Sequence, residues 1–252
     1  ALTNAGFGYR LSKSILHYDD FGSEPKSVEE CVNSPDPYIK VWENAVPESM
    51  YQHLQTHFRK DGPFWREHQY NTEQSGYFSY LHSLERPPEN NLEQIIHRIW
   101  RVTQEGFPTA EAKYAEWWAH CRPHCSGHQL HFDSDDEGIG GVRNPIVSSV
   151  LYLSEGVGGP TLVTTQHLTD EHLGEEGWMA APKLNRLVVF NGSVLHGVIP
   201  GHGPSPDPEG RRTTFMVAFW RDIKERPCPD ETPGSCRPFP REGAPTRYSW
   251  PR

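Results

Sequence analysis

Long hydrophobic runs and an excess of positive charge are both missing from this chain of 252 residues. No stretch of about 18 apolar residues occurs, so we expect no membrane span. The formal net charge is −9, whereas proteins that bind nucleic acids usually carry a basic surface. The first residues also lack the basic start and the apolar segment of a signal peptide. We therefore expect neither a membrane nor a nucleic acid as the partner.

Hydrophobic residues are scarce, at 35%, but aromatic residues reach 12% of the sequence, which argues against disorder. The 23 prolines and 22 glycines indicate many turns, as in short strands that are joined by loops. A chain of this length buries one good-sized core, or two small ones at most. We expect one compact domain with three parts: a loop-rich leader with buttressing helices (1–112), a strand-rich core (113–222) and a Pro-rich tail (223–252).

Cysteines are few as well, and their number, five, is odd. Cys121, Cys125 and His128 could be read as a zinc clip, but a fourth ligand is not evident at the usual spacing. We expect free thiols in a reducing compartment, which favours a cytoplasmic location. Cys228 and Cys236 lie in a Pro-rich loop, and they could pair only if the protein meets an oxidising environment.

Residue patterns also predict elements outside the core. Residues 37–42 read as a strand, and Met50, Leu54 and Phe58 repeat at the spacing of one helix face. A second, buttressing helix is expected over 93–102. The aromatic stretch 64–84 is interpreted as packing against the outside of the core, with a lid over the site as the alternative. Residues 134–141 and 166–182 are expected to be acidic loops, and 200–210 a long hairpin connection.

The residues that carry the predicted chemistry lie between positions 119 and 222. His131 and Asp133 are two apart, so in a strand both side chains point to the same side. His196 follows a hydrophobic run and an Asn-Gly-Ser turn, where its side chain can swing into the core. Two imidazoles and one carboxylate on one face of a metal leave positions open and suit non-haem Fe(II) that activates oxygen. We therefore predict a metal site formed by His131, Asp133 and His196.

Other candidates for these roles were weighed against the same chemistry. His128 is three residues before His131 and points elsewhere in an extended chain, so a structural role is expected. Asp135 and Asp136 carry the right charge but fall in the loop after the strand. His202 is the rival for the second histidine, but it lies among glycines and prolines with no strand to hold it.

Five segments of this region occur in the order found in a known enzyme superfamily. They are 127–133 with its His-x-Asp pair, the hydrophobic run 148–153, the Gly-Gly-Pro-Thr of 158–161, the run 186–196 that ends in histidine, and the Arg-x-Thr of 212–214. Together they resemble the core of the Fe(II)/2-oxoglutarate-dependent oxygenases, and most of all the prolyl-4-hydroxylase-type branch. The resemblance covers about half of the chain.

This resemblance implies a fold and an activity. The fold would be mainly β with flanking helices (α+β), around a double-stranded β-helix, or jelly-roll, core. The cofactors would be Fe(II), 2-oxoglutarate and O2. The enzyme would hydroxylate or otherwise oxidise a C–H bond of its substrate and release succinate and CO2. Members that halogenate lack the carboxylate ligand, so Asp133 favours hydroxylation or a related oxidation.

The resemblance also implies a cation that holds the far carboxylate of 2-oxoglutarate. Arginine suits this role because its guanidinium is planar, always charged and bidentate. Arg212, with Thr214 on the same strand face, fits the pattern of the superfamily, and Arg211 would then be a solvated charge at the edge. Tyr152 lies where the superfamily often bonds the same carboxylate, although a plain core tyrosine is the alternative. The 16 positions from His196 to Arg212 exceed the spacing in the prolyl-hydroxylase branch, which leaves the choice of Arg211 open.

The substrate is less well defined by the sequence. We expect a small molecule, such as an amino acid or a natural product, in a closed pocket. A protein hydroxylase that acts on a prolyl or another residue in an open groove is the alternative. A catalytically silent β-helix binding module is a more distant one.

Overall fold

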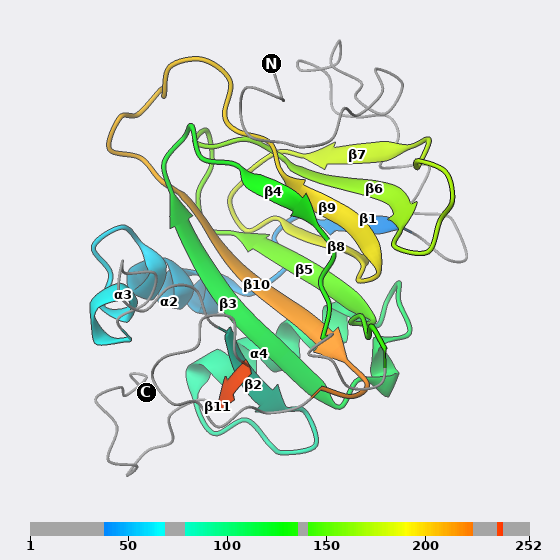
Figure 1. The fold of residues 1–252 in the computed structure, drawn as a ribbon. Coiled ribbons are helices and arrows are strands. Elements are labelled where there is room, and N and C mark those ends of the chain that lie inside the picture. Colours follow the sequence, from blue (N-terminus) through cyan, green and yellow to red (C-terminus); the bar gives the residue numbers. More distant parts are fainter. Residues whose placement is uncertain (1–37, 69–78, 136–140, 224–235, 239–252) are drawn as a thin grey trace.

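Two layers of mostly antiparallel strands form the centre of the computed structural model, which describes residues 38–68, 79–135, 141–223 and 236–238 (Figure 1). The major sheet has seven strands and the minor sheet has four. In spatial order the major sheet contains β1 (Ile39–Trp42), β8 (Leu187–Asn191), β5 (Val147–Tyr152), β10 (Arg212–Trp220), β3 (Tyr114–Arg122), β2 (Ser79–Ser83) and β11 (Cys236–Pro238). The minor sheet contains β4 (His128–His131), β9 (Val194–Val198), β6 (Thr161–His167) and β7 (Gly177–Ala180). The expected double-stranded β-helix core with flanking helices is confirmed.

Strand β10 lies at the centre of the major sheet, and all of its nine residues are buried. It pairs antiparallel with β3 on one side and with β5 on the other. Its β-branched and aromatic residues suit a strand that is covered on both faces. Phe215 and Val217 belong to the cluster that contains the helices, whereas Met216 packs with residues of the minor sheet. Because side chains alternate along a strand, Arg212 and Thr214 face the minor sheet with Met216.

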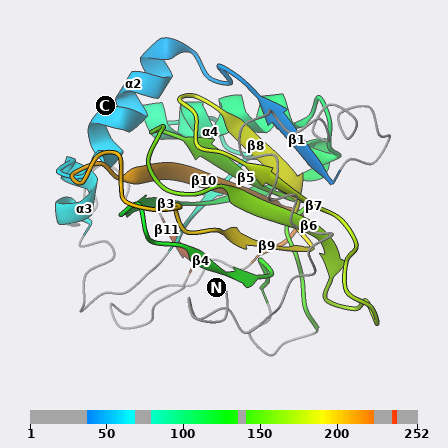
Figure 2. The ribbon, with the colours of Figure 1, turned by 90° about the horizontal axis from the view of Figure 1, so that it is seen from above.

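Helices cover the face of the major sheet that points away from the minor sheet (Figures 1 and 2). They are α2 (Glu48–Phe58), α3 (Pro63–Glu67) and α4 (Asn91–Thr103), followed by a 3-10 turn, η3 (Thr109–Glu111). The N-cap of helix α4 is Asn90, whose side chain accepts a hydrogen bond of 2.9 Å from the backbone N–H of Glu93. The strand predicted over 37–42 and the helices predicted over 47–58 and 93–102 are present with small shifts of their ends.

Two described aromatic residues of the stretch 64–84 pack on the helix side of the major sheet. Phe64 and Tyr80 are buried, and their rings lie 6.0 and 4.9 Å from that of Trp117 on β3. Phe64 and Tyr80 therefore pack against the core and are not part of a lid over the site. Tyr70, Tyr77 and Phe78 lie outside the described residues.

Strand β7 corrects one expectation, since residues 166–182 were predicted to be a loop. Residues 177–180 pair with β6, and β6 itself extends to His167. Trp178 is buried and stacks on Tyr38 at 5.9 Å between ring centroids. A strand of four residues that directly follows an acidic segment is too short for its alternation to be recognised in the sequence.

The thiols of Cys121 and Cys125 are free, as expected. The possible pairing of Cys228 with Cys236 cannot be followed, because Cys228 lies outside the described residues. No described helix combines the length and the apolar character that a membrane crossing requires.

The turn between β5 and β6 determines the space beside β10. Gly158 has a φ of +82°, a backbone conformation that L-residues with side chains rarely adopt. A Cβ at this position would lie 2.5 Å from Cδ of Arg212. Glycine is therefore required here both for the turn and for the passage of the Arg212 side chain.

Replacement of Phe215 tests the packing of the helices on the major sheet. Its side chain is fully buried, and its ring stacks on Phe58 of α2 at 5.5 Å. Phe215→Ala should lower the free energy of unfolding, measured by urea denaturation, by about 3–5 kcal/mol, because it leaves a cavity in the core. Leu168→Ala is the control: Leu168 is 53% exposed, and its loss should change stability by less than about 0.5 kcal/mol. Equal effects of the two changes would contradict the packing described.

Candidate metal centre

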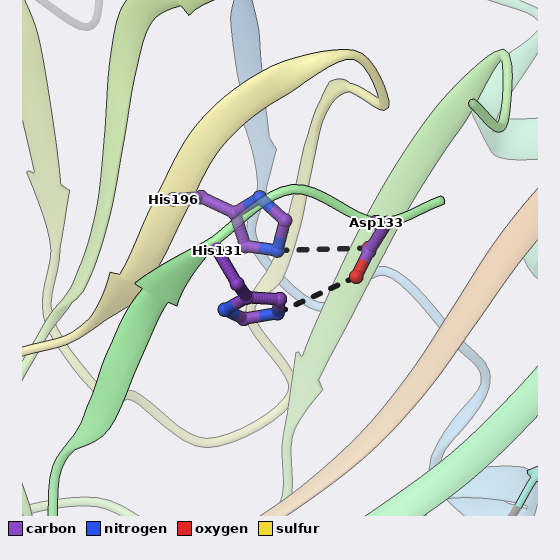
Figure 3. A group of neighbouring side chains, drawn as sticks. All are labelled: His131, Asp133 and His196. Atoms are coloured by element: carbon purple, nitrogen blue, oxygen red, sulfur yellow. Dashed lines mark ion pairs between the residues drawn. The ribbon is translucent and has the colours of Figure 1, made fainter. Parts of the chain in front are cut away.

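Three side chains from neighbouring parts of the minor sheet converge in the cavity between the sheets (Figure 3). His131 is the last residue of β4, Asp133 lies two residues further on, and His196 is the middle residue of β9. The antiparallel pairing of these strands places His131 directly opposite His196. Directly opposite residues have side chains on the same face of a sheet. The strand pairing therefore brings the two imidazoles together, and the alternation after His131 adds the carboxylate.

The carboxylate of Asp133 lies between the two imidazoles. Its Oδ1 is 3.4 Å from Nε2 of His131, and its Oδ2 is 3.6 Å from Nε2 of His196. One ligand atom from each of the three residues lies within 4.8 Å of the others. In the ranges that the structure describes, no other group of three or more His, Cys, Asp or Glu side chains meets this condition, so the Cys121–Cys125–His128 clip has no support.

Hydrogen bonds to the backbone orient the imidazole rings of both histidines. Nδ1 of His131 lies 2.8 Å from the backbone oxygen of Gln129, and Nδ1 of His196 lies 3.0 Å from that of Val194. A carbonyl oxygen only accepts, so both Nδ1 atoms carry the hydrogen and donate it. This assigns the lone pair of each neutral ring to Nε2, which faces the carboxylate.

Asp133 is held from a third strand. The hydroxyl of Ser148 on β5 donates a hydrogen bond of 2.5 Å to Oδ2 of Asp133. The side-chain amide of Asn144 donates one of 2.6 Å to the backbone oxygen of Asp133. The carboxylate is therefore oriented by the major sheet while it faces two histidines of the minor sheet.

The electrostatics of the cluster favour an ionised carboxylate. Burial alone would raise the pKa of Asp133, but the adjacent His196 and His131 and the Ser148 hydroxyl hold the pKa of that carboxyl well below its usual range. Burial lowers the pKa of His196. Burial acts in the same direction on His131, but the hydrogen bond to Asp133 and the charge of Asp133 outweigh it and raise the pKa of His131. Two imidazole nitrogens and one carboxylate oxygen, all aimed at one point, fit a divalent metal of the Fe(II) type.

His128 corrects the expectation that it points away from the site. From His128 to His131 the chain advances three residues, whereas the paired segment of β9, Val198 to His196, advances two. This bulge shifts the alternation, so both histidines face the same side. The ring of His128 stacks on that of His131 at 4.6 Å with an interplanar angle of 19°. The alternation rule was therefore the wrong guide here.

Arg212 is a buried cation in the same cavity as the metal-binding cluster. Its Nε donates to the backbone oxygen of Gly159 at 3.1 Å, and its Nη2 donates to Oγ1 of Thr161 at 2.9 Å. Within the described ranges no carboxylate forms an ion pair with it, and Nη1 makes no hydrogen bond. A buried charge without a counterion is costly, so this guanidinium is suited to an anionic ligand.

Arg211 is placed differently, at the edge of the strand. Its Nη1 is hydrogen-bonded to the backbone oxygens of Pro208, Glu209 and Gly210, and its side chain is partly exposed. The strand register therefore directs Arg212, not Arg211, into the core.

Tyr152 and Thr214 lie beside Arg212 but are not among the residues that line the cavity. The hydroxyl of Tyr152 donates to the backbone oxygen of Ala180 at 2.8 Å and lies 2.7 Å from Oγ1 of Thr161. Its ring lies 5.1 Å from the guanidinium carbon of Arg212, within the range of a cation–π contact. Tyr152 thus supports Arg212 from behind. Oγ1 of Thr214 is buried and has no hydrogen-bond partner among the described residues.

The cavity wall combines these polar groups with apolar side chains. Trp118, Val150, Phe190 and Met216 line it together with the His131, Asp133 and His196 cluster. Such a wall keeps bulk water away from the polar groups and strengthens the electrostatic interactions inside the cavity.

Comparisons with known proteins extend this picture at the level of fold. No family model and no curated protein matches the sequence. Among solved structures, the chain is similar to a prolyl-4-hydroxylase from Pseudomonas putida, with 18% identity, a TM-score of 0.47 and coverage of 74% of this chain and 94% of that one. It is also similar to a viral collagen prolyl hydroxylase from Paramecium bursaria Chlorella virus-1, with 13% identity, a TM-score of 0.43 and coverage of 75% of this chain and 97% of that one. A third similar structure is SnoK, a non-haem α-ketoglutarate-dependent carbocyclase from nogalamycin biosynthesis, with 7% identity, a TM-score of 0.48 and coverage of 78% of this chain and 84% of that one.

Proposed function

We propose that this protein is an Fe(II)- and 2-oxoglutarate-dependent oxygenase that oxidises a C–H bond of its substrate. One observation supports this above all. The same cavity between the sheets is lined by a cluster of two histidines and a carboxylate and by a buried arginine that has no counterion among the described residues. The cluster suits a metal that retains open positions, and the arginine suits the far carboxylate of a dicarboxylic cosubstrate.

His131, Asp133 and His196 would hold the iron. When bound, Fe(II) supplies the activation of O2 that couples oxidation of the substrate to conversion of 2-oxoglutarate into succinate and CO2. The protein contributes the orientation of the donors. The backbone oxygens of Gln129 and Val194 keep both Nε2 atoms available, and Ser148 keeps the carboxylate turned toward them.

Arg212 would bind the carboxylate of 2-oxoglutarate that lies farther from the metal. Nε and Nη2 are used to hold the side chain in place, which leaves Nη1 for the ligand. Thr214 is two residues further along the same strand face, and its buried hydroxyl has no partner among the described residues. Because it does not line the cavity, its part in cosubstrate binding stays a prediction. Tyr152 would act through Arg212 and Thr161 rather than by direct contact.

A small-molecule substrate, such as an amino acid or a natural product, is the form of this proposal that we prefer. A polar cavity of about 290 Å³ adjoins the metal-binding cluster, close to the lower end of the range for small-molecule sites, about 300–1,000 Å³. Hydroxylation of a prolyl or another residue in a protein is the alternative. A silent β-helix binding module would release no succinate under any condition, so a succinate assay separates it from both.

Replacement of a histidine tests the metal site. His131→Ala or His196→Ala should weaken Fe(II) binding by at least about a hundredfold, because loss even of groups that only orient a ligand costs about 10–100-fold. His202→Ala is the matched control: this exposed histidine was the rival for the second position, and its loss should leave metal binding unchanged. Metal content after dialysis, measured by mass spectrometry, provides the result. If His131→Ala kept the metal and the parent rate of succinate formation, the assignment would be wrong.

The two adjacent arginines test the cosubstrate site. A buried ion pair that loses one partner costs roughly 3–5 kcal/mol, so Arg212→Ala should raise the required 2-oxoglutarate concentration by about a hundredfold or more. Arg211→Ala should change it little, because an exposed charge pair is worth only about 0–1 kcal/mol. Both variants should still bind iron. A titration of 2-oxoglutarate by succinate formation measures the effect, and a large loss in Arg211→Ala alone would overturn the role of Arg212.

Two adjacent serines on β5 test whether orientation of Asp133 matters. Ser148→Ala removes the hydroxyl that bonds Oδ2 of Asp133 and should weaken metal binding by about 10–100-fold. Ser149 is also buried, but its hydroxyl donates to the backbone oxygen of Val217 at 2.6 Å. Ser149→Ala should therefore leave the metal affinity unchanged, although it removes a buried hydrogen bond as well. Equal metal affinities of the two variants would show that Ser148 has no role in the site.

A further inference from the structure

The β3–β4 and β9–β10 connections lie at the same end of the β-helix (upper left in Figure 1). A second, polar cavity is lined by residues at the end of β3, in the β3–β4 connection, in β4, at the end of β9 and at the start of β10. Its volume is about 290 Å³, space for roughly ten water molecules. The residues that line it and carry polar side chains are His120, Arg122, Ser126, His128, Gln129 and Arg212.

The charge in this cavity is not balanced by the protein. Arg122 and Arg212 are directly opposite each other in the pairing of β3 with β10. Like charges in such positions are destabilising. Among the described residues, no acidic one lines the cavity and no carboxylate pairs with either arginine. An anion bound between these strands would offset the repulsion.

Arg122 points into the barrel, because it alternates with His120 and Trp118 along β3, and both of these line the metal-binding cavity. Both arginines contribute to the lowering of the pKa of His120, which agrees with their proximity, although burial is the larger cause. The proposed function requires only one of the two cations, Arg212, for the cosubstrate. The proposed function therefore assigns no role to Arg122.

The two cavities are continuous along one wall. His120, His128, Val198 and Arg212 line both of them. The imidazole of His128 stacks on the proposed ligand His131 at 4.6 Å. A molecule with one end at Arg122 would therefore extend along His128 toward the metal-binding cluster.

We propose that the cavity at Arg122 binds an oxyanion of the substrate, a carboxylate or a phosphate of a small molecule, and directs the remainder of that molecule toward His131, Asp133 and His196. The guanidinium of Arg122 supplies the charge. Ser126 and Gln129 supply neutral hydrogen-bonding groups at the mouth of the cavity. This inference rests on the proposed function and narrows its substrate class to anionic small molecules.

Anion binding to the zinc-bound protein, which should hold 2-oxoglutarate without turnover, tests the proposal. With 2-oxoglutarate saturating, inorganic phosphate and acetate are titrated separately by calorimetry. At least one of them should bind beside 2-oxoglutarate, and which of the two binds more tightly distinguishes a phosphate from a carboxylate as the group recognised. Arg122→Gln should weaken that binding by about tenfold to a hundredfold, the range for hydrogen bonds to a charged group. Its affinity for 2-oxoglutarate should not change.

Matched variants keep the result interpretable. Arg122→Lys retains the charge and should keep part of the affinity, and it serves in place of Arg122→Gln if the latter fails to fold. Arg211→Gln removes a nearby arginine that is bound to backbone oxygens and should have no effect. An equal loss in Arg211→Gln and Arg122→Gln would mean non-specific salt binding and would overturn the proposal.

Two further outcomes would overturn it while the proposed function stands. The first is unchanged anion binding in Arg122→Gln. The second is a loss of 2-oxoglutarate affinity in that variant as large as the loss of phosphate or acetate affinity, because Arg122 would then belong to the cosubstrate site. Failure of the zinc-bound parent protein to bind 2-oxoglutarate at all would instead contradict the proposed function itself.

Discussion

The burial of an ionised carboxylate, that of Asp133, is the constraint on which the arrangement of the site depends. A buried charge is costly unless it is paired and hydrogen-bonded. Here the partners come from three strands: His131 from β4, His196 from β9 and Ser148 from β5. None of these strands provides the environment alone. Both sheets must therefore be assembled before the cluster exists, so formation of the barrel and formation of the site are a single event.

The positive charge of Arg212 is also held by residues of both sheets. Arg212 begins the central strand of the major sheet, and its guanidinium is held by Gly159 and Thr161 at the start of the minor-sheet strand β6. The ring of Tyr152 supports it from the side. One cavity thus contains a cluster that favours a cation, together with an arginine that no carboxylate of the described part of the chain neutralises. A bound metal would neutralise the cluster, and a bound anion would neutralise the arginine. In a structural ion pair, by contrast, the two charged side chains neutralise each other.

Part of this arrangement could be predicted from the sequence, because it depends on residues that are neighbours in the chain. The alternation of His131 with Asp133 depends only on the period of a strand. The preference for Arg212 over Arg211 came instead from the resemblance to a known superfamily, and the strand period required only that one of the two face inward. In the structure Arg212 is the buried one. The position of His128 depends on a bulge that is defined by its partner strand, so no pattern within 126–133 could reveal it. The pairing of Arg122 with Arg212 joins residues 90 positions apart in the chain. A single sequence contains no signal for such a contact.

The turn at Gly158 links two parts of the molecule that the chain order separates. Its backbone passes so close to Arg212 that any side chain at 158 would occupy the volume of the arginine. The two positions are therefore not independent in evolution. A lineage that replaces the arginine by a smaller residue loses the steric reason for glycine at 158, although the positive φ of the turn still disfavours other residues. A lineage that keeps the arginine must inherit the glycine with it.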